Sequence, residues 1–164
     1  MIVICNTSPL TSLAAIGQFD LLHQLYGRLH IAEGIWEELN ARGQRWPVRD
    51  EVAAAGWIER HTVQNQALVT ALRRDLDRGE AETIALALEL GADLVLLDER
   101  EGRHTAQRLE LRVTGVVGLL LEAKARDALP AIRPHLDALR QKAGFYLSEP
   151  VYEAALSLAG ESDT

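Results

Sequence analysis

The sequence has a single cysteine and no long apolar run. Cys5 alone cannot form an intramolecular disulfide or a thiolate metal site, and its place in an apolar run predicts a buried thiol without redox chemistry. The longest apolar runs, at 94–97 and 116–121, fall far short of the roughly 20 residues that a membrane-spanning helix needs. Because the first residues also lack a basic segment and a small-residue cleavage site, we expect a cytoplasmic protein without a membrane segment.

Motifs for several common chemistries are also missing. No glycine-rich dinucleotide loop follows the first apolar run and no Walker-type glycine–lysine loop occurs, so nucleotide-cofactor and NTPase functions lack their phosphate-binding element. Five histidines lack the spacing of zinc ligands, and we expect each to be a surface or structural residue: His23, His30, His61, His104 and His135. The net charge of −7 repels phosphate, so nucleic acid must be held by a local basic patch or through metal ions.

The composition that is present is that of a globular protein. Of 164 residues, 48% are hydrophobic and 25% are charged, which is enough to close one core, and we expect one domain over residues 1–164. Two entirely apolar runs, 2–5 and 94–97, stop at a polar residue, which is typical of strands buried on both faces of a parallel sheet. We expect these two strands to be central neighbours.

Shorter or mixed runs predict three further strands, at 29–32, 57–63 and 111–114. Helical spacing of apolar residues fills the intervals between strands. Three predicted helices end at Gly17, at Gly27 and near Gly43. Further helices are predicted at 66–77, 80–90, 103–110, 116–126 and 135–143, and Ser148 is expected to cap the last helix. This alternation predicts an α/β fold with a parallel sheet of about five strands covered on both sides.

Polar residues follow the two central strands, at the sheet edge where parallel sheets bind their ligands. Asn6, Thr7 and Ser8 follow the first strand, and Asp98 and Glu99 follow the second. Because neighbouring strands are about 4.8 Å apart, Asn6 and Asp98 are expected side by side. The alternative is that Asn6 or Ser8 caps the helix that follows and that Asp98 caps a following turn.

Two acidic pairs on predicted helices could face the same edge. They are Glu37 with Glu38, and Glu80 with Glu82. The alternative for Glu37 and Glu38 is an acidic pair on the solvent-exposed face of a helix. The alternative for Glu80 and Glu82 is a charge in the first turn of a helix, where the helix dipole favours it. Carboxylates that converge repel each other unless one is protonated or a divalent cation lies between them. Convergence would predict a Mg²⁺ or Mn²⁺ site, which suits phosphoryl chemistry.

Four segments occur in a particular order and spacing: IVICNTSPL at 2–10, IWEEL at 35–39, GEAETIALA at 79–87 and ADLVLLDER at 92–100. Together they resemble the PIN-domain family, in particular the small prokaryotic PIN-like proteins related to VapC-type toxins. The resemblance covers residues 1 to about 120. It implies a three-layer α/β/α sandwich with a central parallel sheet and a metal-dependent endoribonuclease site.

The resemblance also implies roles for individual residues. The catalytic and metal-binding set is Asn6, Glu38, Glu80 and Asp98, with Glu99 as a further metal ligand and Glu37 and Glu82 as alternates. Substrate would be held by Thr7, Ser8, Arg100 and Arg103, although the two arginines can equally be a solvated helix start. Asn6 departs from the aspartate expected at its position. An amide oxygen can coordinate a cation, but the missing negative charge weakens binding.

Two functions from different classes follow. The first is an endoribonuclease that uses Mg²⁺ or Mn²⁺, cleaves RNA, and is the toxin of a toxin–antitoxin pair with a cognate antitoxin as partner. The second is a PIN-like module that binds nucleic acid or protein without catalysis, as Asn6 suggests; a small-molecule α/β enzyme is a third. We also expect a homodimer, because the resemblance implies a family whose members usually pair and because a late amphipathic segment is expected to leave apolar surface to cover: Leu136, Leu139, Tyr146, Val151 and Tyr152.

Overall fold

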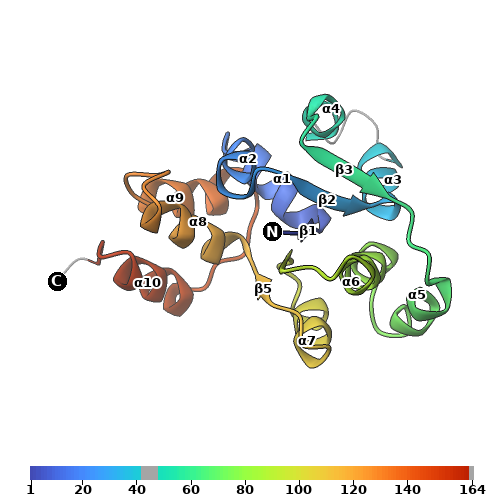
Figure 1. Ribbon diagram of the computed structural model, residues 1–164. Helices are drawn as coiled ribbons and strands as arrows, with labels where there is room; N and C mark the ends of the chain where they lie inside the picture. Colours follow the sequence, from blue (N-terminus) through green and yellow to red (C-terminus); the bar gives the residue numbers. More distant parts are fainter. Residues whose placement is uncertain (42–47, 163–164) are drawn as a thin grey trace.

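The computed structural model describes residues 1–41 and 48–162. Its five strands form one parallel sheet in the order β3-β2-β1-β4-β5 (Figure 1). The strands are β1 (Val3–Cys5), β2 (Leu29–Ala32), β3 (Ile58–His61), β4 (Leu94–Leu96) and β5 (Val113–Thr114). The predicted class is confirmed, and β1 is central with β4 beside it, as the two apolar runs indicate.

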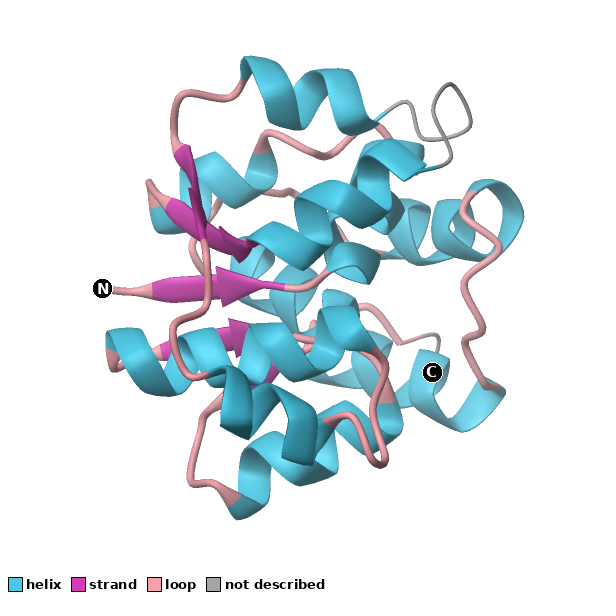
Figure 2. Ribbon diagram, turned by 90° about the vertical axis from the view of Figure 1, so that its right-hand side faces the viewer, coloured by secondary structure: helices cyan, strands magenta, loops and turns pink. Residues whose placement is uncertain are grey.

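Helices lie on both sides of the sheet and give the three-layer α/β/α arrangement (Figure 2). They are α1 (Thr7–Ala15), α2 (Leu21–Tyr26), α3 (Glu33–Ala41), α4 (Val48–Ala54), α5 (Gln66–Leu72), α6 (Arg78–Leu90), α7 (Arg100–Arg108), α8 (Val116–Ala125), α9 (Arg133–Lys142) and α10 (Glu149–Leu158). None of these helices in the described ranges is long and apolar enough to cross a membrane.

The core is built on the two central strands. Every residue of β1 and β4 is buried, and Cys5 is a fully buried free thiol, as its apolar neighbours predict. Helix α6 packs against β1, β2 and β4 and buries the apolar face of its 13 residues. Because α6 also contacts α3, the first turn of α6 and the body of α3 meet at the carboxyl edge of the sheet.

Some predicted boundaries were wrong. Helix α5 ends at Leu72 rather than at 77, because residues 73–75 form a turn before α6 begins. Helix α4 has no counterpart in the sequence prediction; it is short and charged, and only Val48 and Val52 are buried. The stop predicted near Gly43 lies outside the described residues. Ser148 caps the last helix as predicted, because its hydroxyl accepts a hydrogen bond from the Val151 amide.

The late segment expected to leave apolar surface mostly packs within the chain. Leu136 and Leu139 are fully buried and Tyr152 is nearly so. Tyr146 and Val151 stay exposed, at 87% and 48%. Two of the five side chains on which the dimer expectation rests are therefore available to a partner.

Candidate active site

The ends of β1 and β4 lie next to each other. The Asn6 amide N–H donates to the Leu96 carbonyl at 3.0 Å, which extends the pairing between the two strands. Both strands are parallel, so the residues after them, including Asp98, continue from the same carboxyl edge of the sheet. The fold thus brings the two predicted strand-end residues to one edge.

Asn6 precedes α1 but does not cap it. Its backbone is in the N-cap position, yet its side chain makes no capping hydrogen bond and is 5% exposed. Instead, the Thr83 hydroxyl of α6 donates to Asn6 Oδ1 at 3.2 Å. The capping alternative is therefore wrong for Asn6. Sequence reasoning missed Thr83, although it lies three residues after Glu80 and hence near the same face of α6.

Asp98 is held by a helix that comes later in the chain. The Val116 amide, at the start of α8, donates to Asp98 Oδ1 at 2.9 Å. Gly115 makes the approach possible, since a Cβ there would lie 2.5 Å from Asp98 Oδ1. Asp98 Oδ2 is buried and has no hydrogen-bond partner within the described residues. Asp98 therefore caps α8 rather than its own following turn, and one carboxylate oxygen stays unused.

Glu38 reaches the same edge from α3. The Thr7 hydroxyl donates to Glu38 Oε2 at 3.0 Å, which joins α3 to the first residue of α1. A Cβ at Gly79 would lie 3.0 Å from the same oxygen, so Glu38 also touches the first turn of α6. Thr7 orients the carboxylate of Glu38, and its contact with substrate stays a prediction.

The alternates Glu37 and Glu82 have a different environment. Arg78 forms ion pairs with both of them, at 2.5 Å each. Glu82 is also buried and accepts a hydrogen bond from the Gly34 amide at 3.2 Å, which joins α6 to α3. No ion pair among the described residues involves Glu38 or Glu80. Arg78 thus forms an ion pair with one member of each acidic pair and not with the other.

This chain matches the family DUF3368, described as a PIN domain, over residues 2–161. The chain belongs to the PIN-domain family. PIN domains are generally nucleases and usually use divalent metals. Comparison with curated proteins finds no match.

In this PIN domain, burial is the largest influence on the pKa of Asp98. Burial raises the pKa of the Asp98 carboxyl, while the Val116 amide and the Arg103 guanidinium oppose the rise. The Ser8 hydroxyl is near enough to lower the pKa of Asp98, although it forms no hydrogen bond of normal geometry with Oδ2. Arg103 is positioned by a hydrogen bond to the Leu97 carbonyl at 3.3 Å.

Glu80 begins α6 in a capping box with Asp77, whose carboxylate accepts from the Glu80 amide at 2.8 Å. The pKa of Glu80 is raised to about 7, chiefly by burial and also by the negative charges of Asp77, Glu99 and Glu38, against the backbone hydrogen bond at Asp77. Glu99 raises the pKa of Asp98 as well. Glu38, Glu80, Glu99 and Asp98 are therefore electrostatically one acidic cluster.

The cluster offers the donor chemistry of a divalent-cation site, although within the described residues no three of its carboxylates bring their oxygens within 4.8 Å of one another. Asp98 Oδ2 is a buried carboxylate oxygen without a donor, which costs free energy unless a cation or proton is present. The charges that raise the pKa of Glu80 are of the sign that a cation would neutralise. The donors are carboxylate and amide oxygens, the ligands that Mg²⁺ and Mn²⁺ take in proteins.

Two cavities flank Asp98. One of about 850 Å³ is lined by Ser8, Glu99, Lys142 and Tyr146 among others. The second, of about 470 Å³, lies beside Arg103 and Tyr146. Tyr146 lines both cavities and Val151 lines the second, and sequence reasoning had assigned both residues to a dimer interface. Arg100 is exposed at the start of α7 and lines neither cavity.

Replacing Glu80 with glutamine is expected to stabilise the metal-free protein above pH 7. The pKa of Glu80 rises from 4.5 to about 7 on folding, so the folded state holds its proton more tightly and stability falls as pH rises between these values. Glutamine has no proton to lose. After discounting for solvent screening, the gain is on the order of 1–2 kcal/mol above pH 7 and vanishes below pH 4.5.

Thermal or urea unfolding in EDTA across pH 4–8 measures this difference. Glu153→Gln, which removes an exposed acid on α10, is the matched control and should follow the wild-type profile. A constant difference between wild type and Glu80→Gln at all pH values would contradict the prediction.

Proposed function

We propose that this PIN domain is a metal-dependent endoribonuclease that acts as the toxin of a toxin–antitoxin pair. The observation that carries the nuclease proposal is the unused, buried Asp98 oxygen inside a cluster of three further acids. Family membership supports nuclease chemistry in general. The toxin role and a cognate antitoxin are supported by the sequence resemblance.

Four side chains would hold the cation: Asn6, Glu38, Glu80 and Asp98. When bound, a divalent ion activates water for attack on the phosphodiester and neutralises the charge that builds on the phosphate. The chain orients three of these ligands through hydrogen bonds: the Thr83 hydroxyl donates to Asn6 Oδ1, the Thr7 hydroxyl to Glu38 Oε2, and the Val116 amide to Asp98 Oδ1. Such support keeps ligands in place before the ion binds.

Single-stranded RNA is the substrate that the cavities favour. Tyr146 is 87% exposed between two cavities that both reach Asp98, and an exposed ring at this place can stack an unpaired base. Lys142 lines one cavity and Arg103 the other, where their charges can contact backbone phosphates. These local cations offset the net negative charge of the chain near the site.

Replacing Tyr146 with alanine is expected to raise KM for a short single-stranded RNA with little change in kcat. Base stacking on an aromatic ring is worth about 1–3 kcal/mol, which corresponds to roughly 5- to 150-fold in binding. Steady-state kinetics measure the effect. Tyr146→Phe retains the ring and should behave like wild type; a similar loss in both variants would point to the hydroxyl instead.

The proposed function is tested with the purified chain and a labelled single-stranded RNA. We expect cleavage with Mg²⁺ or Mn²⁺ and none after EDTA treatment, with activity restored when the metal is returned. A labelled DNA of the same sequence tests whether the sugar matters. Cleavage that persists in EDTA would contradict metal dependence.

The second candidate is a module that binds without cleaving, and Asn6 favours it because this residue removes one negative charge from the ligand set. RNA that is retained in a binding assay but stays intact with every divalent metal would support this function over the first. The homodimer also stays a proposal, supported by the exposed Tyr146 and Val151.

A further inference from the structure

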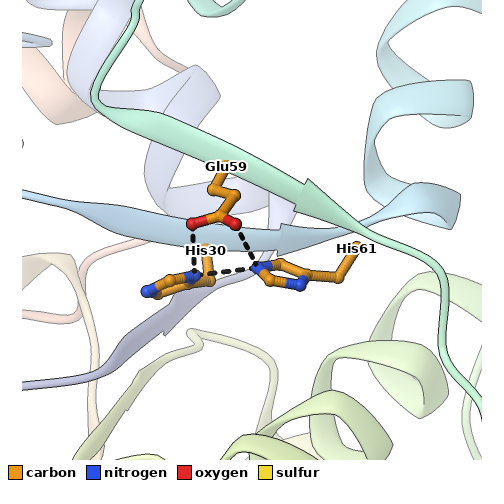
Figure 3. A group of neighbouring side chains, drawn as sticks. All are labelled: His30, Glu59 and His61. Atoms are coloured by element: carbon orange, nitrogen blue, oxygen red, sulfur yellow. Dashed lines mark hydrogen bonds and ion pairs between the residues drawn. The ribbon is translucent and has the colours of Figure 1, made fainter.

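Two histidines and a glutamate that are scattered in the sequence meet on strands β2 and β3. The parallel register places His30 opposite Glu59 and Ala32 opposite His61. Alternate residues of a strand share a face, so His30, Glu59 and His61 project from the same face of the sheet (Figure 3). Arg60, between the two β3 residues, lies over the Trp36 ring of α3, 4.5 Å from its centre.

The donor atoms of the three side chains are at metal-site spacing. His30 Nδ1 lies 2.9 Å from His61 Nε2. Glu59 Oε2 lies 3.7 Å from His30 Nδ1, and Glu59 Oε1 lies 3.9 Å from His61 Nε2. With zinc–ligand bonds of about 2.0–2.1 Å, tetrahedral geometry sets two ligand atoms about 3.3–3.4 Å apart. The two Glu59 distances involve different oxygens, but one ligand atom from each of the three residues lies within 4.8 Å of the other two. Side-chain rotations that shorten the longer distances would form one face of a tetrahedron.

The cluster is open to solvent on one side. The side chains of His30 and His61 are 13% and 23% exposed, and that of Glu59 is 49% exposed. An ion can therefore enter, and water can fill a fourth position. Arg28 lies 3.6 Å from Glu59 Oε2 and is 60% exposed, so it competes for this carboxylate but can swing into solvent.

We propose that His30, Glu59 and His61 form a zinc site that joins the edge strand β3 to β2. Two imidazoles and one carboxylate are a donor set suited to Zn²⁺, whereas Mg²⁺ takes oxygen ligands. The site shares no residue with the acidic cluster, so it does not depend on the proposed nuclease function. β3 has only four residues, each partly or fully exposed, and a metal held by two strands would add a cross-link there.

The test is thermal unfolding of the full chain, treated with EDTA and then titrated with Zn²⁺. At about 100 times the dissociation constant, Zn²⁺ is expected to raise Tm by roughly 5–10 °C. Binding of Co²⁺ should give the visible absorption of a tetrahedral or five-coordinate ion. His61→Asn and Glu59→Gln should each weaken Zn²⁺ binding about 100-fold or more.

Two controls keep the result specific. His104→Asn removes an exposed histidine of α7 and should bind Zn²⁺ like wild type. Asp98→Asn should retain the Zn²⁺ effect, because it alters only the acidic cluster. Circular dichroism of each variant without metal checks that it folds. Glu59→Gln changes a half-exposed position, so it can be used for the test if His61→Asn does not fold. An absent Tm shift in wild type, or an equal shift in the folded variants of the cluster, would overturn the proposal.

Discussion

Replacing Asp98 with asparagine is expected to reduce RNA cleavage by about 10²–10³-fold, the range seen when one charge-stabilising group is removed from an active site. The variant keeps an oxygen that can accept from the Val116 amide, so α8 stays capped. It replaces the unused, buried carboxylate oxygen with either a neutral oxygen or an N–H donor. The negative charge that would hold a cation is lost, whereas the fold is retained.

Initial rates at saturating Mn²⁺, with a parallel calorimetric titration of the metal, measure this effect. Glu153→Gln also removes one negative charge, but from the exposed surface of α10, and should cleave like wild type. Full activity of Asp98→Asn would remove Asp98 from the proposed ligand set.

Replacing Asn6 with aspartate is expected to have the opposite effect: tighter Mg²⁺ or Mn²⁺ binding, by on the order of 10–100-fold, and faster cleavage. The change adds a full charge at a 5% exposed position beside β4, where charge interactions are stronger than in water. The Thr83 hydroxyl can donate to a carboxylate as it does to the amide, so the oxygen keeps its support. Without metal, the same charge is expected to destabilise the fold, because it is buried without a cation to pair with.

Calorimetric titration of Mn²⁺ into wild type, Asn6→Asp and Asp98→Asn separates the possible outcomes. If the site holds a cation, affinity should rise in the first variant and fall in the second. A role in helix capping alone would leave metal affinity unchanged. Equal, negligible heats in all three proteins would contradict the metal site and favour the binding module.

The sequence was sufficient to predict the sheet and the placement of its polar edge. Strands β1 and β4 are wholly apolar and end at polar residues, so local pattern alone placed Asn6 and Asp98 at the same edge. The sequence did not show which residues of each helix face the site. Which glutamate of 37–38 and of 80–82 is left without an ion pair depends on Arg78, whose two ion pairs join α3 to α6.

The cluster of His30, Glu59 and His61 could also not be predicted from the sequence, because its histidines do not have the spacing of zinc ligands. His30 and His61 come together because β2 and β3 pair in one particular register, and a shift of that register by one residue would place them on opposite faces. Spacing along the chain reports metal sites within a loop or helix, but sites made across strands appear only when the pairing is known.

The hydrogen bond between the Val116 amide and Asp98 also bears on when the site forms during synthesis. Asn6 leaves the ribosome early, but the amide that holds Asp98 belongs to a helix well into the second half of the chain. The parallel strands β1 and β4 must pair across that long separation before α8 can dock, and such distant contacts form late in folding. A nascent chain that stops before α8 therefore has all the acidic residues of the proposed site but lacks the amide that positions Asp98.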